Sequence, residues 1–369
     1  MSDGPLWRFF GGVGMVRAMA ILADVARRAG VSAATVSRVL NHPTKVRPEM
    51  RDRVARAMTE LDYVRDGAAR ALASRHSLTI GHVVPTLGIG IFAAGVEVLQ
   101  RRLEEFGYQL LVAASDYDEA KEARQVRALI ERGVDGIALV GHRHAPEVYE
   151  MLRSRKLPYV NSYQFDGRNP HPCIGFDNQS GAFDLTRYLV DLGHREFGIV
   201  TAPPGLNDRV AARLKGIIDC LGERGIGTAA RHIVEVPQTI LAGRGATRAL
   251  LAAHPNLTAI CCTTDTLAVG ALCECRELGV RVPDHVSVTG FSDLEIVSQL
   301  DPPLSTVRIP TDKIGARIAD FLLDRIAGKA GPKKIELEAS VVIRGSTGPA
   351  RRRVLRAAAS GRLSERLTP

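Results

Sequence analysis

Long apolar runs are missing from this 369-residue sequence. No stretch of about eighteen consecutive apolar residues occurs, so the chain holds no obvious transmembrane helix. The first residues also lack the basic start, extended apolar run and small-residue cleavage site of a secretory signal peptide. We therefore expect a cytoplasmic protein, with residues 1–18 as a disordered extension.

Cysteine is scarce, and the spacing of the cysteines does not indicate a metal site. The six cysteines form none of the paired, short-spaced groups of Cys or His that a zinc site requires. Cys261 and Cys262 lie in an apolar strand pattern, which is typical of small core residues. We expect no metal and no cofactor.

Catalytic signatures are also absent. The sequence has no phosphate-binding loop, no Gly-x-Ser-x-Gly elbow and no convincing nucleophile beside a base. Gly243 and Gly245 lack the acidic ribose partner of a dinucleotide fingerprint. We therefore expect that the protein is not an enzyme.

Positive charge is concentrated at the two ends of the chain. Residues 1–76 hold 13 Lys and Arg against 7 Asp and Glu, and residues 349–369 hold 6 against 1, whereas the whole chain has a net charge of +9. The middle is therefore slightly acidic. A local basic excess indicates a nucleic-acid footprint at the amino terminus and a basic tail over 349–369.

The stretch LADVARRAGVSAATVSRVLN, residues 22–41, is the most informative in the chain. Two helical apolar patterns are joined by Gly30 and Val31, and Ser32 is a good N-cap for the second helix. A third helix begins at Pro48 and runs to about Leu61. This pattern predicts a helix-turn-helix DNA-binding domain over residues 19–63, although small helical hairpins also occur as plain bundle pieces.

The second helix of this pattern is the expected recognition helix. Arg38 is the residue best suited to hydrogen-bond a guanine, and Ala33 and Ala34 can contact thymine methyl groups. We expect the DNA contacts of this helix to come from Ser32, Ala33, Ala34, Thr35, Ser37, Arg38 and Asn41. Phosphate contacts are expected from Arg27, Arg28, Arg47, Arg51 and Arg70.

Residues 64–76 connect this domain to the rest of the chain. Asp66 can cap a helix from about Gly67 to Ser74, which is too short to be stable alone in water. Arg70 can reach a phosphate, and Leu72 can wedge between base steps in the minor groove. A hinge helix that folds on DNA is therefore predicted; a flexible basic linker is the alternative.

From residue 78 onward, short apolar runs alternate with helical patterns. Eight strand signals, from LTIGHVV to VSVTGF, divide into two similar halves at about 175–178. Such alternation gives parallel sheets covered on both faces. The predicted fold class is α/β: a small all-α head, a hinge helix and two doubly wound parallel-sheet subdomains that face each other across a cleft.

Several ordered motifs resemble the LacI/GalR family of bacterial transcriptional regulators. They include DVARRAGVSAATVSRVLN, AARALAS, DLGHREFGIV, PPLSTVR and VVIRGST, and the likeness covers about residues 20–348. The resemblance implies a periplasmic-binding-protein-like core over 77–348. Its N-subdomain would comprise about 77–175 and 310–335, and its C-subdomain about 176–306 and 336–348, joined by three parallel hinge strands. It also implies a repressor that binds a palindromic operator as a homodimer.

Ligands of open parallel sheets bind beyond the carboxyl ends of the strands, so the residues that follow each apolar run should line the cleft. The resemblance implies that Arg213 and Asp265 contact the polar part of a small effector and that Phe92 covers a sugar ring. The full expected effector site is Phe92, His144, Asn161, Tyr163, Arg213, Asp265, Ser292 and Asp293.

The rim sequence His142, Arg143 and His144 favours an anionic ligand, unless this trio is only a solvated loop. VGHRHAPEVYEML also resembles the gluconate-regulator branch of the family, so a gluconate-like sugar acid is the favoured effector over a neutral sugar. The rival interpretations are an α/β enzyme, because two doubly wound domains with a cleft also describe many dehydrogenases and kinases, and a sugar-binding protein without a regulatory role.

Overall fold

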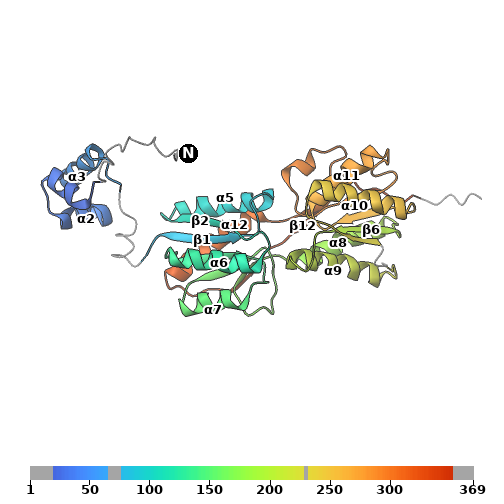
Figure 1. The fold of residues 1–369 in the computed structure, drawn as a ribbon, viewed down its shortest axis with the longest axis horizontal. Coiled ribbons are helices and arrows are strands. Elements are labelled where there is room, and N and C mark those ends of the chain that lie inside the picture. Colours follow the sequence, from blue (N-terminus) through green and yellow to red (C-terminus); the bar gives the residue numbers. More distant parts are fainter. Residues whose placement is uncertain (1–19, 65–75, 228–231, 352–369) are drawn as a thin grey trace, which may run out of the picture. The chain divides into compact units, whose positions relative to one another are not determined.

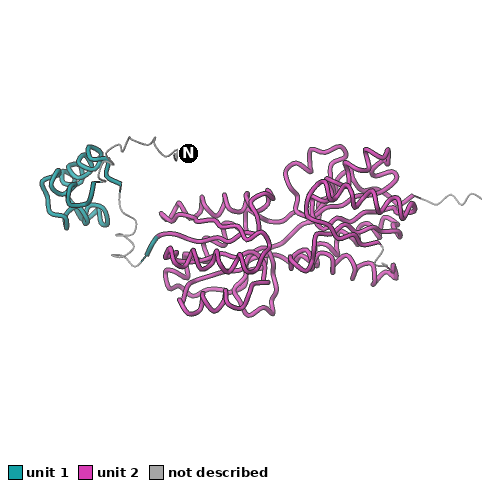
Figure 2. The backbone as a smooth tube through the Cα atoms, in the orientation of Figure 1, with its two compact units in different colours: residues 1–77 teal, residues 78–369 magenta. Residues whose placement is uncertain are grey.

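The computed structural model describes residues 20–64, 76–227 and 232–351. The chain divides into two compact units, residues 1–77 and 78–369 (Figure 2). Each unit has its own hydrophobic core among the described residues. The expected terminal extension over 1–18, the hinge segment from Gly67 to Ser74 and most of the tail over 349–369 lie outside the described residues. Within the described part, no helix is long and apolar enough to cross a membrane.

The first unit is a three-helix domain. It contains α1 (Leu22–Ala29), α2 (Ala33–Asn41), a 3-10 turn (Pro43–Lys45) and α3 (Pro48–Glu60). Val25, Val36 and Val54 are completely buried where the three helices meet. Gly30 ends α1 with φ 62°, a left-handed conformation that glycine adopts without strain.

The amino-terminal lobe of the second unit is built on a six-stranded parallel sheet in the order β11-β5-β4-β3-β1-β2. The strands are β1 (Thr79–Val84), β2 (Gln109–Ala114), β3 (Gly136–Val140), β4 (Tyr159–Ser162), β5 (Cys173–Gly175) and β11 (Lys334–Glu336). Ile80 and Val84 pack toward α5 (Gly90–Glu104) and α12 (Thr311–Ile326). Val83 packs toward α6 (Glu119–Glu131) and α7 (Pro146–Ser154) on the other face.

The carboxyl-terminal lobe has a four-stranded parallel sheet in the order β7-β6-β8-β9. Its strands are β6 (Phe197–Thr201), β7 (Ile233–Glu235), β8 (Ala259–Cys262) and β9 (Ser287–Thr289). Helices α8 (Asn178–Asp191) and α9 (Asp208–Glu223) cover one face, and α10 (Ile240–Ala253) and α11 (Asp265–Glu277) cover the other (Figure 1). A 3-10 turn (Glu295–Ser298) follows β9.

The chain passes between the lobes three times: between β5 and α8, between β10 (Thr306–Arg308) and α12, and between β11 and β12 (Ser340–Val342). The expectation of three parallel hinge strands is wrong, because β10 pairs antiparallel with β12 through Thr306 and Val342. The physical reason is that the second passage returns toward the first lobe, whereas the third leaves it again.

Candidate functional site

The helix-turn-helix domain presents the start of α2 to solvent. Ser32 caps this helix: its hydroxyl oxygen accepts the backbone N–H of Thr35 at 3.1 Å and lies 2.9 Å from the Thr35 hydroxyl oxygen. Ala33, Ala34 and Arg38 are exposed. Polar and small side chains on an exposed first turn form a surface that fits a major groove.

Two other predicted recognition residues, Ser37 and Asn41, lie in the same helix. Asn41 is exposed and donates from its side-chain amide to the Ser37 hydroxyl at 3.2 Å. Arg53 of α3 donates to the Ala29 carbonyl oxygen at 2.6 Å and thereby satisfies the carboxyl end of α1. The Arg53 contact attaches α3 to the turn between α1 and α2.

The expected phosphate-binding arginines differ in what they contact. Arg27 pairs with Asp24 at 3.2 Å and Arg28 pairs with Glu60 at 2.5 Å. Arg47 and Arg51 have no ion pair within the described residues. Arg70, like Leu72, is outside the described part of the chain.

The cleft between the two lobes of the second unit contains two connected cavities. The inner chamber, of about 30 Å³, is lined by Ile89, Ile91, Phe92, Tyr117, Tyr163, Asn207, Arg209, Arg213, Gln238, Thr264, Ser292 and Ile309. The outer chamber, of about 550 Å³, is lined by Thr86, Gly88, Ile89, Asp116, Tyr117, Ala202, Pro203, Leu206, Asn207, Pro237 and Gln238. Both chambers lie beyond the carboxyl ends of strands, as expected for this architecture.

Arg213 of α9 is the most unusual charge in the inner chamber. It is 7 % exposed, and its guanidinium donates to the Asn178 side-chain oxygen at 2.8 Å and to the Thr263 carbonyl oxygen at 3.1 Å. The guanidinium carbon lies 4.0 Å from the centre of the Phe291 ring. Burial, followed by the nearby charge of Arg209, lowers the pKa of Arg213. No ion pair joins Arg213 to a carboxylate within the described residues.

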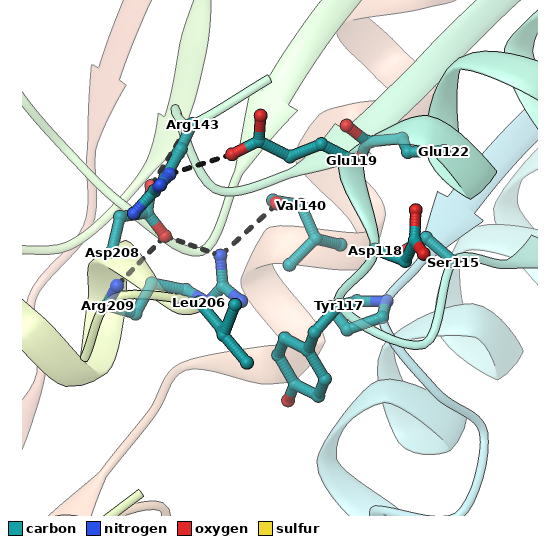
Figure 3. A pocket seen from close by; sticks show the side chains of 11 residues that line it. Ser115, Tyr117, Asp118, Glu119, Glu122, Val140, Arg143, Leu206, Asp208 and Arg209 are labelled. Atoms are coloured by element: carbon teal, nitrogen blue, oxygen red, sulfur yellow. Dashed lines mark hydrogen bonds and ion pairs between the residues drawn. The ribbon is translucent and has the colours of Figure 1, made fainter. Parts of the chain in front are cut away.

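Asp208 and Arg209, at the start of α9, bridge the two lobes. The Asp208 carboxylate accepts the backbone N–H of His142 at 2.5 Å and that of Arg143 at 3.2 Å. Arg209 pairs with Asp208 at 2.8 Å and donates to the Val140 carbonyl oxygen at 3.2 Å (Figure 3). Burial alone would raise the pKa of Asp208, but Arg209 and the His142 N–H hold that pKa below its usual value. We call these contacts the interlobe bridge.

Gly141 allows the interlobe bridge to form. Its φ is 92°, and a Cβ at this position would lie 2.1 Å from Nη1 of Arg209 and 2.7 Å from a carboxylate oxygen of Asp208. The backbone of residues 141–143 can therefore approach α9 closely only when position 141 carries no side chain.

Four of the eight residues expected at the effector site line the inner chamber: Phe92, Tyr163, Arg213 and Ser292. The Phe92 and Tyr163 rings make an edge contact with centres 5.4 Å apart. The Tyr163 hydroxyl donates to the Ile91 carbonyl oxygen at 3.3 Å.

Asp265 lies just behind the chamber wall. Its carboxylate accepts the Thr306 hydroxyl at 2.7 Å and the Leu294 N–H at 2.8 Å. Burial raises the pKa of Asp265 to about 6. Because Thr306 is the first residue of β10, Asp265 attaches α11 to one of the segments that pass between the lobes.

The other three expected residues are not brought to the chambers. Asn161 is completely buried within β4 and donates to the Tyr149 hydroxyl at 2.8 Å, whereas His144 lies 2.7 Å from Glu122. Asp293 forms ion pairs of 2.6 Å with Arg308 and 2.7 Å with Arg344. Asn161 is a strand residue, so its side chain faces the helical layer instead of the strand end.

Sequence reasoning missed Tyr117, Asn207 and Arg209, which line the inner chamber. Tyr117 follows Asp116, and both have positive φ, 61° and 54°. Strained backbone of this kind in non-glycine residues is common at binding sites. The available signal was that residues 115–117 follow an apolar run, as the other site residues do.

Comparisons with known proteins agree with this architecture. Residues 21–66 match the family described as "Bacterial regulatory proteins, lacI family", and residues 186–347 match the "Periplasmic binding protein-like domain". The HTH-type transcriptional regulator GntR of Escherichia coli is 31% identical over 320 residues, which cover 86% of this chain and 95% of the relative. IdnR of the same organism is 32% identical over 305 residues, covering 83% and 91%.

A lac repressor dimer solved with operator and the anti-inducer ONPF is similar in structure, with a TM-score of 0.81 and 27% identity over 89% of this chain and 99% of that one. A LacI-family regulator from Silicibacter pomeroyi gives a TM-score of 0.82 with 26% identity over the same shares. The chain belongs to the LacI family of transcriptional regulators.

Proposed function

We propose that this regulator is a repressor that binds a palindromic operator as a homodimer and that an anionic ligand in the cleft, a gluconate-like sugar acid, controls its DNA affinity. The observation that supports this proposal most strongly is the buried Arg213 guanidinium, which lines the inner chamber and has no carboxylate partner among the described residues. A buried charge without a partner is costly, so an acid ligand would gain a charge-assisted, two-pronged contact there.

The polar lining of the inner chamber supports the same assignment. Asn207, Gln238, Thr264 and Ser292 surround the arginines Arg209 and Arg213. Asn207 and Gln238, which also line the outer chamber, can bind hydroxyl groups of a sugar acid, while Phe92 and Tyr163 form an apolar wall beside its acid group. Of the other expected residues, Asp265 and Asp293 directly follow the lining residues Thr264 and Ser292, whereas His144 and Asn161 line neither chamber.

The dimer follows from the symmetry of the proposed DNA site. Two recognition helices, each reading bases through Arg38 and its neighbours, would enter successive major grooves. Arg70 and Leu72 would contact the DNA from the hinge.

Ligand binding would shift the lobes and thereby alter the hinge helices that hold the duplex. The GntR and IdnR relatives are both named as HTH-type transcriptional regulators, which supports a regulatory function.

Fluorescence anisotropy with labelled genomic fragments tests this function. The protein should bind the promoter fragments of its own gene neighbourhood at nanomolar concentration, and gluconate, but not glucose, should change that affinity. Isothermal titration calorimetry should show gluconate binding to the free protein. The proposal fails if no fragment binds at low ionic strength, or if glucose binds and sugar acids do not.

A further inference from the structure

The two chambers of the cleft differ greatly in size. The inner chamber has room for about two water molecules, which is also the size of one carboxylate group. The outer chamber, at about 550 Å³, is in the range of ordinary small-molecule sites. Both are lined by Ile89, Tyr117, Asn207 and Gln238, so one molecule can extend through both.

The outer chamber is mainly apolar. Ile89 comes from one lobe, and Ala202, Pro203, Leu206 and Pro237 come from the other. Leu206 is 62 % exposed, so its apolar side chain is accessible to a molecule in the outer chamber. Figure 3 draws Leu206 and Tyr117 near Arg209, so the apolar surface begins close to the charged group.

Several polar groups of the outer chamber are already occupied. The Asn207 side-chain oxygen accepts the N–H groups of Arg209 and Val210, and the Thr86 hydroxyl accepts the Gly88 N–H. Asp116, which pairs with Lys121, would repel a second negative charge. A polyol chain would therefore lose its hydration here and find few free partners.

We propose that the cleft takes a sugar acid with an apolar ring at the end opposite its carboxylate, of the class of aryl uronides. The carboxylate lies in the inner chamber against Arg213 and Arg209, and the ring lies in the outer chamber against Leu206, Pro203 and Pro237. This inference rests on the proposed function and refines its ligand.

Calorimetry on the full-length protein with four probes tests the inference: D-gluconate, D-glucuronate, phenyl β-D-glucuronide and phenyl β-D-glucoside. The phenyl glucuronide should bind at least tenfold more tightly than glucuronate, because its ring is removed from water. It should also bind at least tenfold more tightly than the phenyl glucoside, which has no carboxylate.

A pair of variants locates the ring. Leu206→Ser should reduce the affinity for phenyl glucuronide at least threefold and leave the affinity for glucuronate unchanged. Leu241→Ser is the matched control, because Leu241 is 79 % exposed on α10 and lines neither chamber. It should leave both affinities unchanged.

The possible outcomes separate the two proposals. If gluconate and glucuronate bind but the phenyl group adds no affinity, the inference is overturned and the proposed function stands. The inference is also overturned if Leu206→Ser weakens both acids equally. If no acid binds at all, the proposed function fails together with it.

Discussion

The Asp208 carboxylate, at the start of α9 in one lobe, accepts the backbone N–H of His142 from the other lobe at 2.5 Å. The neighbouring Arg209 lines the inner chamber and also donates to the Val140 carbonyl oxygen across the cleft. Two consecutive residues therefore connect the ligand chamber with the contact between lobes. An acid that attracts Arg209 would change the strength of this contact.

Asp208→Asn should loosen the interlobe bridge, because a neutral amide is a weaker acceptor and leaves Arg209 without its ion pair. We expect the amide hydrogens of His142 and Arg143 to exchange with deuterium at least tenfold faster, as measured by mass spectrometry. Asp184→Asn is the control, since Asp184 pairs with Arg187 on the exposed side of α8. Equal exchange in Asp208→Asn and the unmodified protein would contradict the role of Asp208.

Arg213→Met should abolish acid binding while the fold persists, because the substitution removes the charge and keeps much of the side-chain volume. We expect the dissociation constant for gluconate to rise at least a hundredfold in calorimetry. Arg187→Met, on the surface of α8, should leave it unchanged. DNA affinity without ligand should also stay unchanged in Arg213→Met, and loss of both activities would instead indicate unfolding.

Arg38→Ala and Arg47→Ala should have different effects on DNA binding. Truncating Arg38 should reduce the binding free energy at the preferred DNA site by about 1–3 kcal/mol, and it should reduce the specificity for one base pair. Truncating Arg47, which is exposed and has no ion pair within the described residues, should weaken binding to all sequences alike and reduce the salt dependence. Binding to a library of operator variants measures both. Unchanged specificity in Arg38→Ala would contradict base reading by this residue.

His82→Leu should stabilise the protein, and more so in acid. His82 is buried in β1, and neither ring nitrogen has a hydrogen-bond partner among the described residues. Burial lowers the pKa of His82 to about 4 from 6.5. Below pH 6.5 the unfolded chain takes up a proton that the folded chain does not, so stability falls as the pH falls toward 4.

Urea unfolding at pH 7 and pH 5 measures this effect. The gain in the free energy of unfolding from His82→Leu should be about 2 kcal/mol larger at pH 5 than at pH 7. His285→Leu is the control, because this ring is only partly buried and accepts the Arg281 N–H, so its replacement should show a much smaller change between the two pH values. A gain that does not depend on pH would mean that packing alone is responsible.

Local signals in the sequence predicted much of the fold. Gly30 and Ser32 mark the turn and cap that the structure contains, and all eight strand signals correspond to strands. The eight signals did not include β5, β10, β11 and β12, which have three residues each, as do the predicted strands β7 and β9. Three residues are too few to show periodicity, so the prediction of such strands depends on the residues that flank them.

The candidate site was harder to predict. Arg213 was found through a motif, whereas Arg209, four positions earlier on the same helix, was not. The pairing of His144 with Glu122 joins residues 22 positions apart, and the entry of Tyr117 into the cleft depends on a positive φ at a residue other than glycine. Neither feature has a local sequence signature, because each is set by tertiary packing.

The pairing of β10 with β12 limits how a ligand can act. These strands and the nearby start of α8 form three tethers that join the lobes at one edge. Tethers grouped in this way resist sliding and separation, but they allow one lobe to swing about them. A ligand that acts as we propose would therefore turn one lobe about this edge, whatever its own chemistry.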